Sequence, residues 1–133
     1  MDLLGPLPYE SLTNKYVLLI KDRATSFLVT APIPDKTKMT VRDAFMQHWV
    51  GHYGVPQVVV SDNEGEFKND ELNVMFKQLG IHHRHTSAQS PQTNGYIERQ
   101  NRTVMVAFRA LEIKTNWAIH LPLITATINN SFI

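Results

Sequence analysis

Apolar and polar residues alternate along the chain in short blocks of differing period. Runs rich in β-branched or aromatic residues span Lys15 to Ile20 and Ser26 to Ile33, separated by the polar segment KDRAT. This pattern predicts a hairpin-like pair of strands. A buried strand is predicted over Gln57 to Val60 and another over Ile81 to Thr86. With the first few residues as a strand, the chain has five predicted strands.

Four other segments have the spacing of amphipathic helices. The first starts at Thr40, with Asp43 three residues later as in a capping box, and ends at Gly54. The second starts at the cap Asn69 and ends at Gly80. A third runs from about Gly95 to Leu111, and the last places four apolar residues at helical spacing: Trp117, Leu121, Ile124 and Ile128.

The order of these elements predicts a mixed sheet flanked by helices, the α/β class. A chain of 133 residues, 43% hydrophobic, fits one domain with one sizeable core. It contains no apolar run of about eighteen residues and does not start like a signal peptide, so we expect a soluble, intracellular, non-secreted protein without membrane contact. Because there are no cysteines, any metal must be held by Asp, Glu or His.

The charges are unevenly distributed, although the net charge is only +1. Residues 1–80 contain eight Lys or Arg against ten Asp or Glu, and residues 81–133 contain five against two. An acidic part that could hold a cation thus precedes a basic part that could bind a phosphate backbone. A chance asymmetry on a solvated surface explains the charges equally well.

One of three candidate carboxylates, Asp62, stands where an α/β sheet commonly has its site. Asp62 follows the apolar strand VVV, Glu98 comes after 35 further residues, and Asp2 lies in the first predicted strand. Converging carboxylates repel one another unless a divalent cation neutralises them, and hard oxygen ligands favour Mg²⁺ or Mn²⁺. Two such ions can stabilise a phosphoryl displacement, so the arrangement predicts chemistry on phosphodiesters.

Four segments together resemble the catalytic core of retroviral and gypsy-type LTR retrotransposon integrases. They are MDLLGPLP, YVLLIKDRAT, HWVGHYGVPQVVVSDNEGEF and SAQSPQTNGYIERQNRTV. The ordered set of Asp, SD after an apolar strand, and PQxNGxxER is far more specific than any single motif. The resemblance spans nearly the whole chain.

This resemblance implies a ribonuclease H-like fold with a five-stranded mixed sheet. It also implies that Asp2, Asp62 and Glu98 are the catalytic and metal-binding acids for two Mg²⁺ or Mn²⁺ ions. The implied activity is 3′-end processing of element DNA and its strand transfer into target DNA. Residues 1–133 would then be the catalytic core fragment of a longer polyprotein product, without the zinc-binding N-terminal and the C-terminal DNA-binding domains.

The DNA-contacting residues are also implied by the resemblance. The segment Ser87 to Gly95 corresponds to a mobile loop beside the active site, with Asn94 contacting the DNA end. Helical spacing separately places Ile97, Val104, Phe108 and Leu111 on a core-facing stripe. It places Glu98, Arg102, Met105 and Arg109 on an adjacent ridge, and Arg99 adds a further phosphate donor. A surface ion pair between Glu98 and Arg102 on an ordinary helix is the structural alternative.

Some positions depart from the family pattern or compete with it. Glu64 occupies the place two after Asp62 where the family usually has Gly, and Ser90 replaces a common His. Phe67 keeps its usual distance from Asp62. Asp22, at another strand end, is the rival of Asp2 for the third carboxylate.

The histidines suggest zinc, but their spacing is unfavourable. His83 and His85 should point opposite to His82 on a strand, and no third ligand stands near the helical pair His48 and His52. We expect packed or interface histidines. The helix that carries them and the last helix have apolar residues on more than one side, including Trp49 and Trp117, which indicates a homodimer or higher homo-oligomer. The alternative is that these residues serve only the monomer core.

Two other functions remain open. One is a domesticated or decayed integrase-derived module that binds DNA or a protein without catalysis. The other is a ribonuclease H-type nuclease that cleaves RNA–DNA hybrids. The expected partner of an integrase is double-stranded DNA, and its expected location is the host nucleus, a virus-like particle or the cytoplasm.

Overall fold

The computed structural model describes residues 1–8, 13–86 and 91–131, with side chains for all of these except 91–98 and 100. It contains five strands: β1 (Asp2–Leu4), β2 (Tyr16–Lys21), β3 (Leu28–Ile33), β4 (Val58–Asp62) and β5 (His82–Thr86). β2 is the centre of an antiparallel sheet, pairing with β1 through Asp2 and Leu19 and with β3 along its whole length. The expected strand pair is therefore confirmed.

The strands form two small sheets rather than the single five-stranded mixed sheet expected from the sequence. Sheet order is β1-β2-β3 in one and β4-β5, a parallel pair, in the other. The two are joined where the Met1 amino group donates a hydrogen bond of 2.8 Å to the Val60 carbonyl. Because β1 has only three residues, regular pairing does not extend from it to β4.

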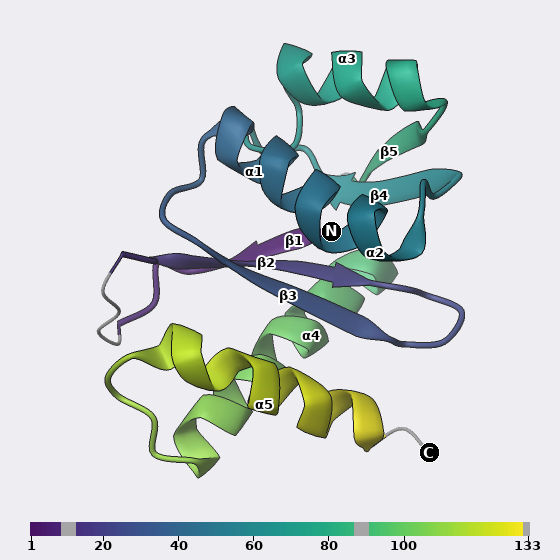
Figure 1. Ribbon diagram of the computed structural model, residues 1–133. Helices are drawn as coiled ribbons and strands as arrows, with labels where there is room; N and C mark the ends of the chain where they lie inside the picture. The colour runs from purple at the N-terminus through teal and green to yellow at the C-terminus, as the bar shows by residue number, and fades with distance from the viewer. Residues whose placement is uncertain (9–12, 87–90, 132–133) are drawn as a thin grey trace.

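Helices cover both sides of the strands: α1 (Lys38–Phe45), a π-helical turn η1 (Met46–Val50), α2 (Gly51–Tyr53), α3 (Asp70–Leu79), α4 (Pro91–Ala110) and α5 (Trp117–Asn130). Figure 1 shows α1 and α3 on one side of β1–β3 and α4 and α5 on the other. Among the described residues no helix has the length and apolarity needed to cross a membrane.

The alternation of β2 explains the two-sided packing. Leu18 and Ile20 belong to a core cluster that includes residues of α1 and α3. Val17 and Leu19 point the other way and belong to a second cluster with α4 and α5. The four apolar residues predicted to face the core from α5 are all buried: Trp117, Leu121, Ile124 and Ile128.

The ends of α3 follow the local signals in its sequence, whereas the start of α1 differs from its prediction. Asn69 caps α3 by accepting from the Leu72 N–H, and Gly80 ends it in the left-handed conformation, as predicted. The predicted cap Thr40 of α1 is wrong. Thr37 is the cap and accepts from the Thr40 N–H, while Asp35 accepts hydrogen bonds from Thr37 and so fixes the earlier start.

Two predictions about α4 are also wrong. The helix begins at Pro91, so positions 91–95 are helical rather than part of a loop, and residues 87–90 lie outside the described residues. Proline is favourable in a first helical turn, where its missing N–H costs nothing. Leu111 lies just past the helix and is 51% exposed, whereas Val104 and Phe108 are buried as predicted. The side chain of Ile97, the fourth residue of that stripe, is not described.

The strand β4 is less buried than its sequence VVV suggested. Val59 is buried, but Val58 is 42% exposed. β4 pairs with β5 along one edge, and the hydrogen bond from Met1 to Val60 ties the other edge to β1. The carboxyl end of β4 therefore lies at the junction of the two sheets.

Candidate active site

Asp2 is a buried acid at the start of β1. It is 6% exposed, and its Oδ2 atom has no hydrogen-bond partner. Burial raises the pKa of the Asp2 carboxyl above its ordinary value, because a desolvated carboxylate is less stable than its neutral form. Hydrogen bonds from the Leu3 backbone and the Asn101 side chain, and the nearby Met1 amino group, oppose this rise in pKa. The carboxylate is thus only partly compensated by the protein.

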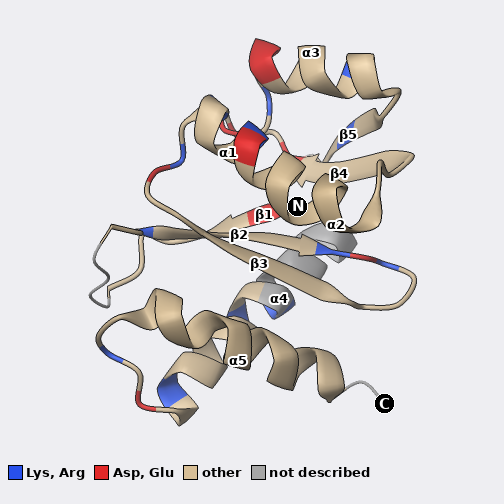
Figure 2. Cartoon of the chain, in the orientation of Figure 1, with Lys and Arg blue, Asp and Glu red and all other residues tan. Residues whose placement is uncertain are grey.

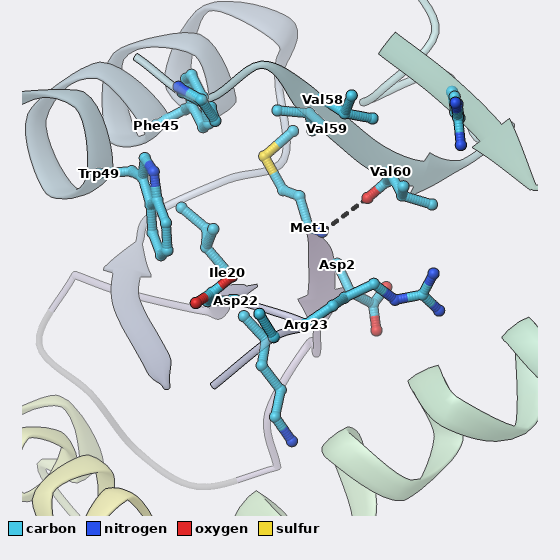
Figure 3. A pocket seen from close by; sticks show the side chains of 14 residues that line it. Met1, Asp2, Ile20, Asp22, Arg23, Phe45, Trp49, Val58, Val59 and Val60 are labelled. Carbon is cyan, nitrogen blue, oxygen red and sulfur yellow. Dashed lines mark hydrogen bonds between the residues drawn. The ribbon is translucent and has the colours of Figure 1, made fainter. Parts of the chain in front are cut away.

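Asp62 lies close to Asp2 because β1 and β4 are neighbours. Met1, the residue before Asp2, donates a hydrogen bond to Val60. This bond holds the start of β1 beside β4, the strand that ends at Asp62. Figure 3 shows this bond beside the Asp2 side chain. The negative charge of Asp62 contributes to the raised pKa of Asp2. The structure therefore brings together two of the three predicted acids.

The Asp62 carboxylate is oriented by its own loop. Its Oδ1 atom accepts the backbone N–H of Glu64 at 2.9 Å, an Asx-type turn that fixes the side chain where the strand ends. Phe67 is fully buried, and its N–H donates to the Glu64 carbonyl at 2.9 Å. A side chain at Gly65 would meet no atom within 4 Å. The unusual Glu64–Gly65 order is therefore accommodated without strain.

Glu98, the third predicted acid, lies in α4, and its side chain is not among those described. Asn94 also lies in α4, and its side chain is likewise not described. The side chain of Asn101, one helical turn after Glu98 on α4, lies close enough to the Asp2 carboxyl to help lower its pKa. Sequence reasoning missed Asn101. The signal that could have found it is its spacing of three residues from Glu98, which puts both positions on one side of the helix.

The rival acid Asp22 is engaged in the turn after β2. Its Oδ2 accepts from the Thr25 hydroxyl at 2.7 Å, its N–H donates to the Phe27 carbonyl, and its carbonyl accepts from the Ser26 N–H. These contacts give Asp22 a role in closing the β2–β3 turn. Asp2 has one carboxylate oxygen without a partner, and that difference favours Asp2 as a cation ligand.

Basic residues lie on α4 and at the end of β2. Arg99, Arg102 and Arg109 are exposed on α4, and the last two are seven residues apart, so they lie on one side of the helix. Figure 2 shows basic positions on the described part of α4 and acidic positions on α1 and α3. Burial, and then repulsion from Arg99, lowers the pKa of Lys21 at the end of β2. Lys21 was not predicted, although it is the last residue of β2 and lines the same cavity as Asp2.

A cavity of about 460 Å³ adjoins Asp2 on the side of Met1. Its lining combines apolar residues from α1, η1 and β4 with charged residues after β2. Trp49 and Phe45 lie on one side in Figure 3, with Asp22 and Arg23 on another. Of the two acids whose side chains are described, Asp2 lines this cavity and Asp62 does not.

The histidines are arranged partly as predicted. The rings of His83 and His85 lie on the same side of β5, with centroids 4.0 Å apart, while His82 is exposed. His48 is half-buried and His52 is exposed, so of the expected packed or interface positions His48 is partly packed, and a place for His52 at an interface stays a prediction. No group of three His, Asp or Glu side chains suited to a metal occurs among the described residues, which exclude the Glu98 side chain.

Apolar surface remains on α5 after the core is formed. Trp117 is fully buried in the monomer, as the alternative to a dimer interface required. Ile119 and Leu123, on the other side of the same helix, are 70% and 62% exposed. Trp49 is partly buried against the core cluster of α1 and α3. Both tryptophans thus serve the monomer core, whereas α5 keeps an exposed apolar face.

Comparison with known families and proteins gives consistent matches. The family model of the TnsB C-terminal domain matches residues 21–112, a range that includes Asp62 and Glu98 and begins after Asp2. The retrovirus-related Pol polyprotein from transposon 412 of Drosophila melanogaster is 31% identical over 123 residues, which are 91% of this chain and 10% of that polyprotein. The Gag-Pol polyprotein of koala retrovirus is 29% identical over 121 residues, 89% of this chain and 7% of that protein. This chain thus spans about a tenth or less of the length of these two polyproteins.

A solved structure shares the fold. The catalytic core domain of BIV integrase superposes with a TM-score of 0.63 at 20% sequence identity, over 84% of this chain and 69% of that one. This similarity shows a ribonuclease H-like arrangement, as expected from the sequence. Five strands are present as predicted, although they are divided between two sheets.

Proposed function

Because the chain belongs to the integrase and transposase catalytic cores, within the TnsB C-terminal domain family and the retroviral and retrotransposon Pol relatives, we propose that it catalyses DNA integration. The proposed activity is that of a polynucleotidyl transferase. It hydrolyses a phosphodiester at the ends of element DNA and then joins the new 3′ hydroxyl to target DNA. Asp2, Asp62 and Glu98 are the proposed catalytic acids.

The observation that carries this proposal is the pairing of Asp2 with Asp62. Two acids that are 60 positions apart in the chain lie on the neighbouring strands β1 and β4, near enough for the charge of Asp62 to act on Asp2. One of them is buried with an unpartnered oxygen. A buried anion that lacks a full set of donors is costly, so its retention is explained best by a cation that is bound during function.

The residues fit divalent ions. Asp2 and Asp62 offer hard carboxylate oxygens, the ligands that Mg²⁺ and Mn²⁺ prefer, and Glu98 lies one helical turn before Asn101, which contacts Asp2. When bound, two divalent ions would activate the attacking oxygen and stabilise the leaving oxygen of a phosphoryl displacement. The chain itself contributes the orientation: the Glu64 N–H holds Asp62, and Asn101 holds Asp2.

DNA would lie along the basic side of α4. Arg99, Arg102 and Arg109 are exposed there. Lys21 is close enough to Arg99 for repulsion between the two charges to contribute to its lowered pKa. Clustered cations repel one another and are stabilised by a polyanion, so phosphate contacts at these residues would position DNA beside the acids. Asn94 is the proposed contact to the DNA end.

Three wider features of the protein are also proposals. The chain acts as the catalytic core, residues 1–133, of a longer product. Its exposed α5 residues Ile119 and Leu123 support a homodimer or higher homo-oligomer, because apolar side chains that the monomer leaves in water are covered in such a contact. The proposed location is the host nucleus, a virus-like particle or the host cytoplasm.

The test is a disintegration assay, which reseals a branched DNA in Mn²⁺ and places the fewest demands on flanking domains. We expect the wild-type chain to reseal the substrate. Asp62→Asn and Glu98→Gln should each lower the rate by about a thousandfold or more, because residues that act as one catalytic unit fail together. The matched controls are Asp22→Asn, the rival acid, and Asp70→Asn, an exposed acid on α3, and both should keep wild-type rates.

Activity that survives Asp62→Asn or Glu98→Gln would refute the assignment. A chain that binds DNA equally well in all variants but never reseals it would instead support the non-catalytic, integrase-derived module. Cleavage of RNA–DNA hybrids without resealing would indicate a ribonuclease H-type nuclease.

A further inference from the structure

A polar cluster of one buried and two partly buried residues lies directly behind Asp62 and has no part in the function described so far. Ser61 is fully buried, and its hydroxyl lies 2.7 Å from Nε2 of His83 and 3.2 Å from the carbonyl oxygen of Asp62. Nδ1 of His85 lies 3.1 Å from the same carbonyl. We propose that Ser61, His83 and His85 are positioning residues that fix the Asp62 peptide, so that its carboxylate is held ready for a divalent cation. This inference rests on the proposed function.

The direction of each hydrogen bond follows from the groups available. The Asp62 carbonyl can only accept, so His85 must carry its proton on Nδ1 and donate it. The Ser61 hydroxyl has one proton, which it donates to the same carbonyl, and a carbonyl oxygen has two lone pairs for the two donors. Ser61 must then accept from Nε2–H of His83.

This assignment also explains the remaining nitrogen of His83. Its Nδ1 is buried without a partner, and in the Nε2–H form that atom is a bare acceptor rather than an orphaned N–H donor. Burial is the main cause that lowers the pKa of His83 to about 4, followed by the nearby His85, so the ring is neutral at physiological pH. A neutral ring can donate from Nε2 while adding no charge beside the acids.

Packing holds the His83 ring in this place. The ring of Phe76, on α3, packs edge to face against the His83 ring, with centroids 4.6 Å apart. The His85 ring also packs against the His83 ring, with centroids 4.0 Å apart. The cluster therefore links the core under α3 to the end of β4. Together with the Glu64 N–H that holds Oδ1, it constrains both the main chain and the side chain of Asp62.

The experiment compares variants of the full chain by two readouts. Ser61→Ala and His83→Leu remove a donor, His83→Gln keeps an N–H near the Nε2 position, and His82→Leu changes an exposed histidine on the opposite side of β5. Mn²⁺ affinity is measured by calorimetric titration. We expect about tenfold weaker binding for Ser61→Ala and His83→Leu, since residues behind a metal ligand commonly contribute a factor of 10 to 100, and wild-type binding for the other two.

The second readout does not involve metal. The exchange rate of the Glu64 amide proton, measured by NMR without divalent ions, reports whether Asp62 Oδ1 stays in place. We expect exchange about fivefold faster in Ser61→Ala and His83→Leu and unchanged rates in His83→Gln and His82→Leu.

The outcomes separate the two proposals. If Ser61→Ala and His83→Leu are folded and both keep wild-type Glu64 exchange, or if His82→Leu has the same effect as His83→Leu, the positioning role is refuted. If the wild-type chain binds no Mn²⁺ but the exchange rates follow the expected pattern, the proposed metal function fails and the positioning of Asp62 stands. If His83→Leu does not fold, Ser61→Ala alone decides the result.

Discussion

The two acids at the junction of β1 and β4 are held in opposite ways. Asp2 is buried, has an unpartnered carboxylate oxygen and has a raised pKa. Asp62 is only partly buried, and hydrogen bonds fix its side chain and its peptide. The comparison shows that one acid is left electrostatically unsatisfied by the folded chain, whereas the other is given a fixed geometry. A cation would satisfy the first and use the second.

Divalent metal should have the largest effect on this comparison. At a concentration about one hundred times its Kd, Mn²⁺ should raise the free energy of unfolding by about 2.7 kcal/mol, because it binds only the folded chain. Asp2→Asn and Asp62→Asn should each abolish most of this gain. Chemical denaturation at pH 7 with and without Mn²⁺ measures it, and Asp22→Asn is the control. Equal stabilisation in all four proteins would mean that the ion binds elsewhere.

Without metal, the two acids should respond differently to neutralisation. The pKa of Asp2 is raised in the folded chain above its ordinary value of 3.8, so the folded state binds a proton more tightly than the unfolded state. Stability therefore falls as pH rises from 3.8 through the raised pKa, and at pH 7 Asp2 destabilises the fold. Asp2→Asn should then stabilise the metal-free protein by about 1 kcal/mol.

Asp62→Asn provides the contrast, since Asn can still accept the Glu64 N–H and the Asp62 side chain is only partly buried. We expect no gain in its free energy of unfolding without metal. Urea denaturation from pH 4 to 8 measures both variants. A stabilisation by Asp62→Asn equal to that by Asp2→Asn would remove the distinction between the two acids.

The support behind Asp62 should be sensitive to acid. Burial, with smaller contributions from His85, the Met1 amino group and His82, lowers the pKa of His83 from 6.5 to about 4. Unfolded chains bind this proton more readily, so the stability that His83 contributes is complete above pH 6.5 and is lost as pH falls toward 4. The loss of stability over this range should be shallower in His83→Gln than in the wild type. Parallel pH profiles of the two proteins would contradict a buried neutral His83.

The smallest effect is expected for DNA contacts on α4. Arg102→Ala or Arg109→Ala should each reduce the slope of log K against log salt for DNA binding by about 1, because one phosphate contact is lost. Fluorescence anisotropy with a labelled duplex between low and moderate salt measures the slope. Lys77→Ala, on α3, is the control and should leave the slope unchanged.

The sequence predicted the features that depend on local pattern. Asn69, Gly80 and the apolar spacing of α5 follow from signals within one helix, and all are confirmed. Asp62 at a strand end could be predicted because the apolar run stops there abruptly. The prediction of Thr40 as a cap is wrong, because Thr37, three residues earlier, caps the helix and is itself held by Asp35. This signal is equally local.

The remaining features depend on contacts between distant segments. Asn101 reaches Asp2 only because α4 packs against β1, and Ser61 meets His83 only because β4 and β5 pair in one particular register. The register of two strands and the placement of a helix cannot be predicted from the residues that are adjacent in the sequence. The division into two sheets likewise follows from the shortness of β1, which the sequence of the first residues did not reveal.

The most direct test of the account is paramagnetic broadening by Mn²⁺ in NMR spectra of the full chain. A divalent ion at the proposed site should broaden the signals of Asp2, Asp62 and Glu98 first, at Mn²⁺ concentrations far below that of the protein, and Mg²⁺ should reverse the effect. Signals of Asp22 should be broadened less than those of Asp2. Broadening that is centred on Asp22, or that is spread over the exposed acids of α1 and α3 while Asp2 and Asp62 stay sharp, would contradict the claim that these three acids hold the metal.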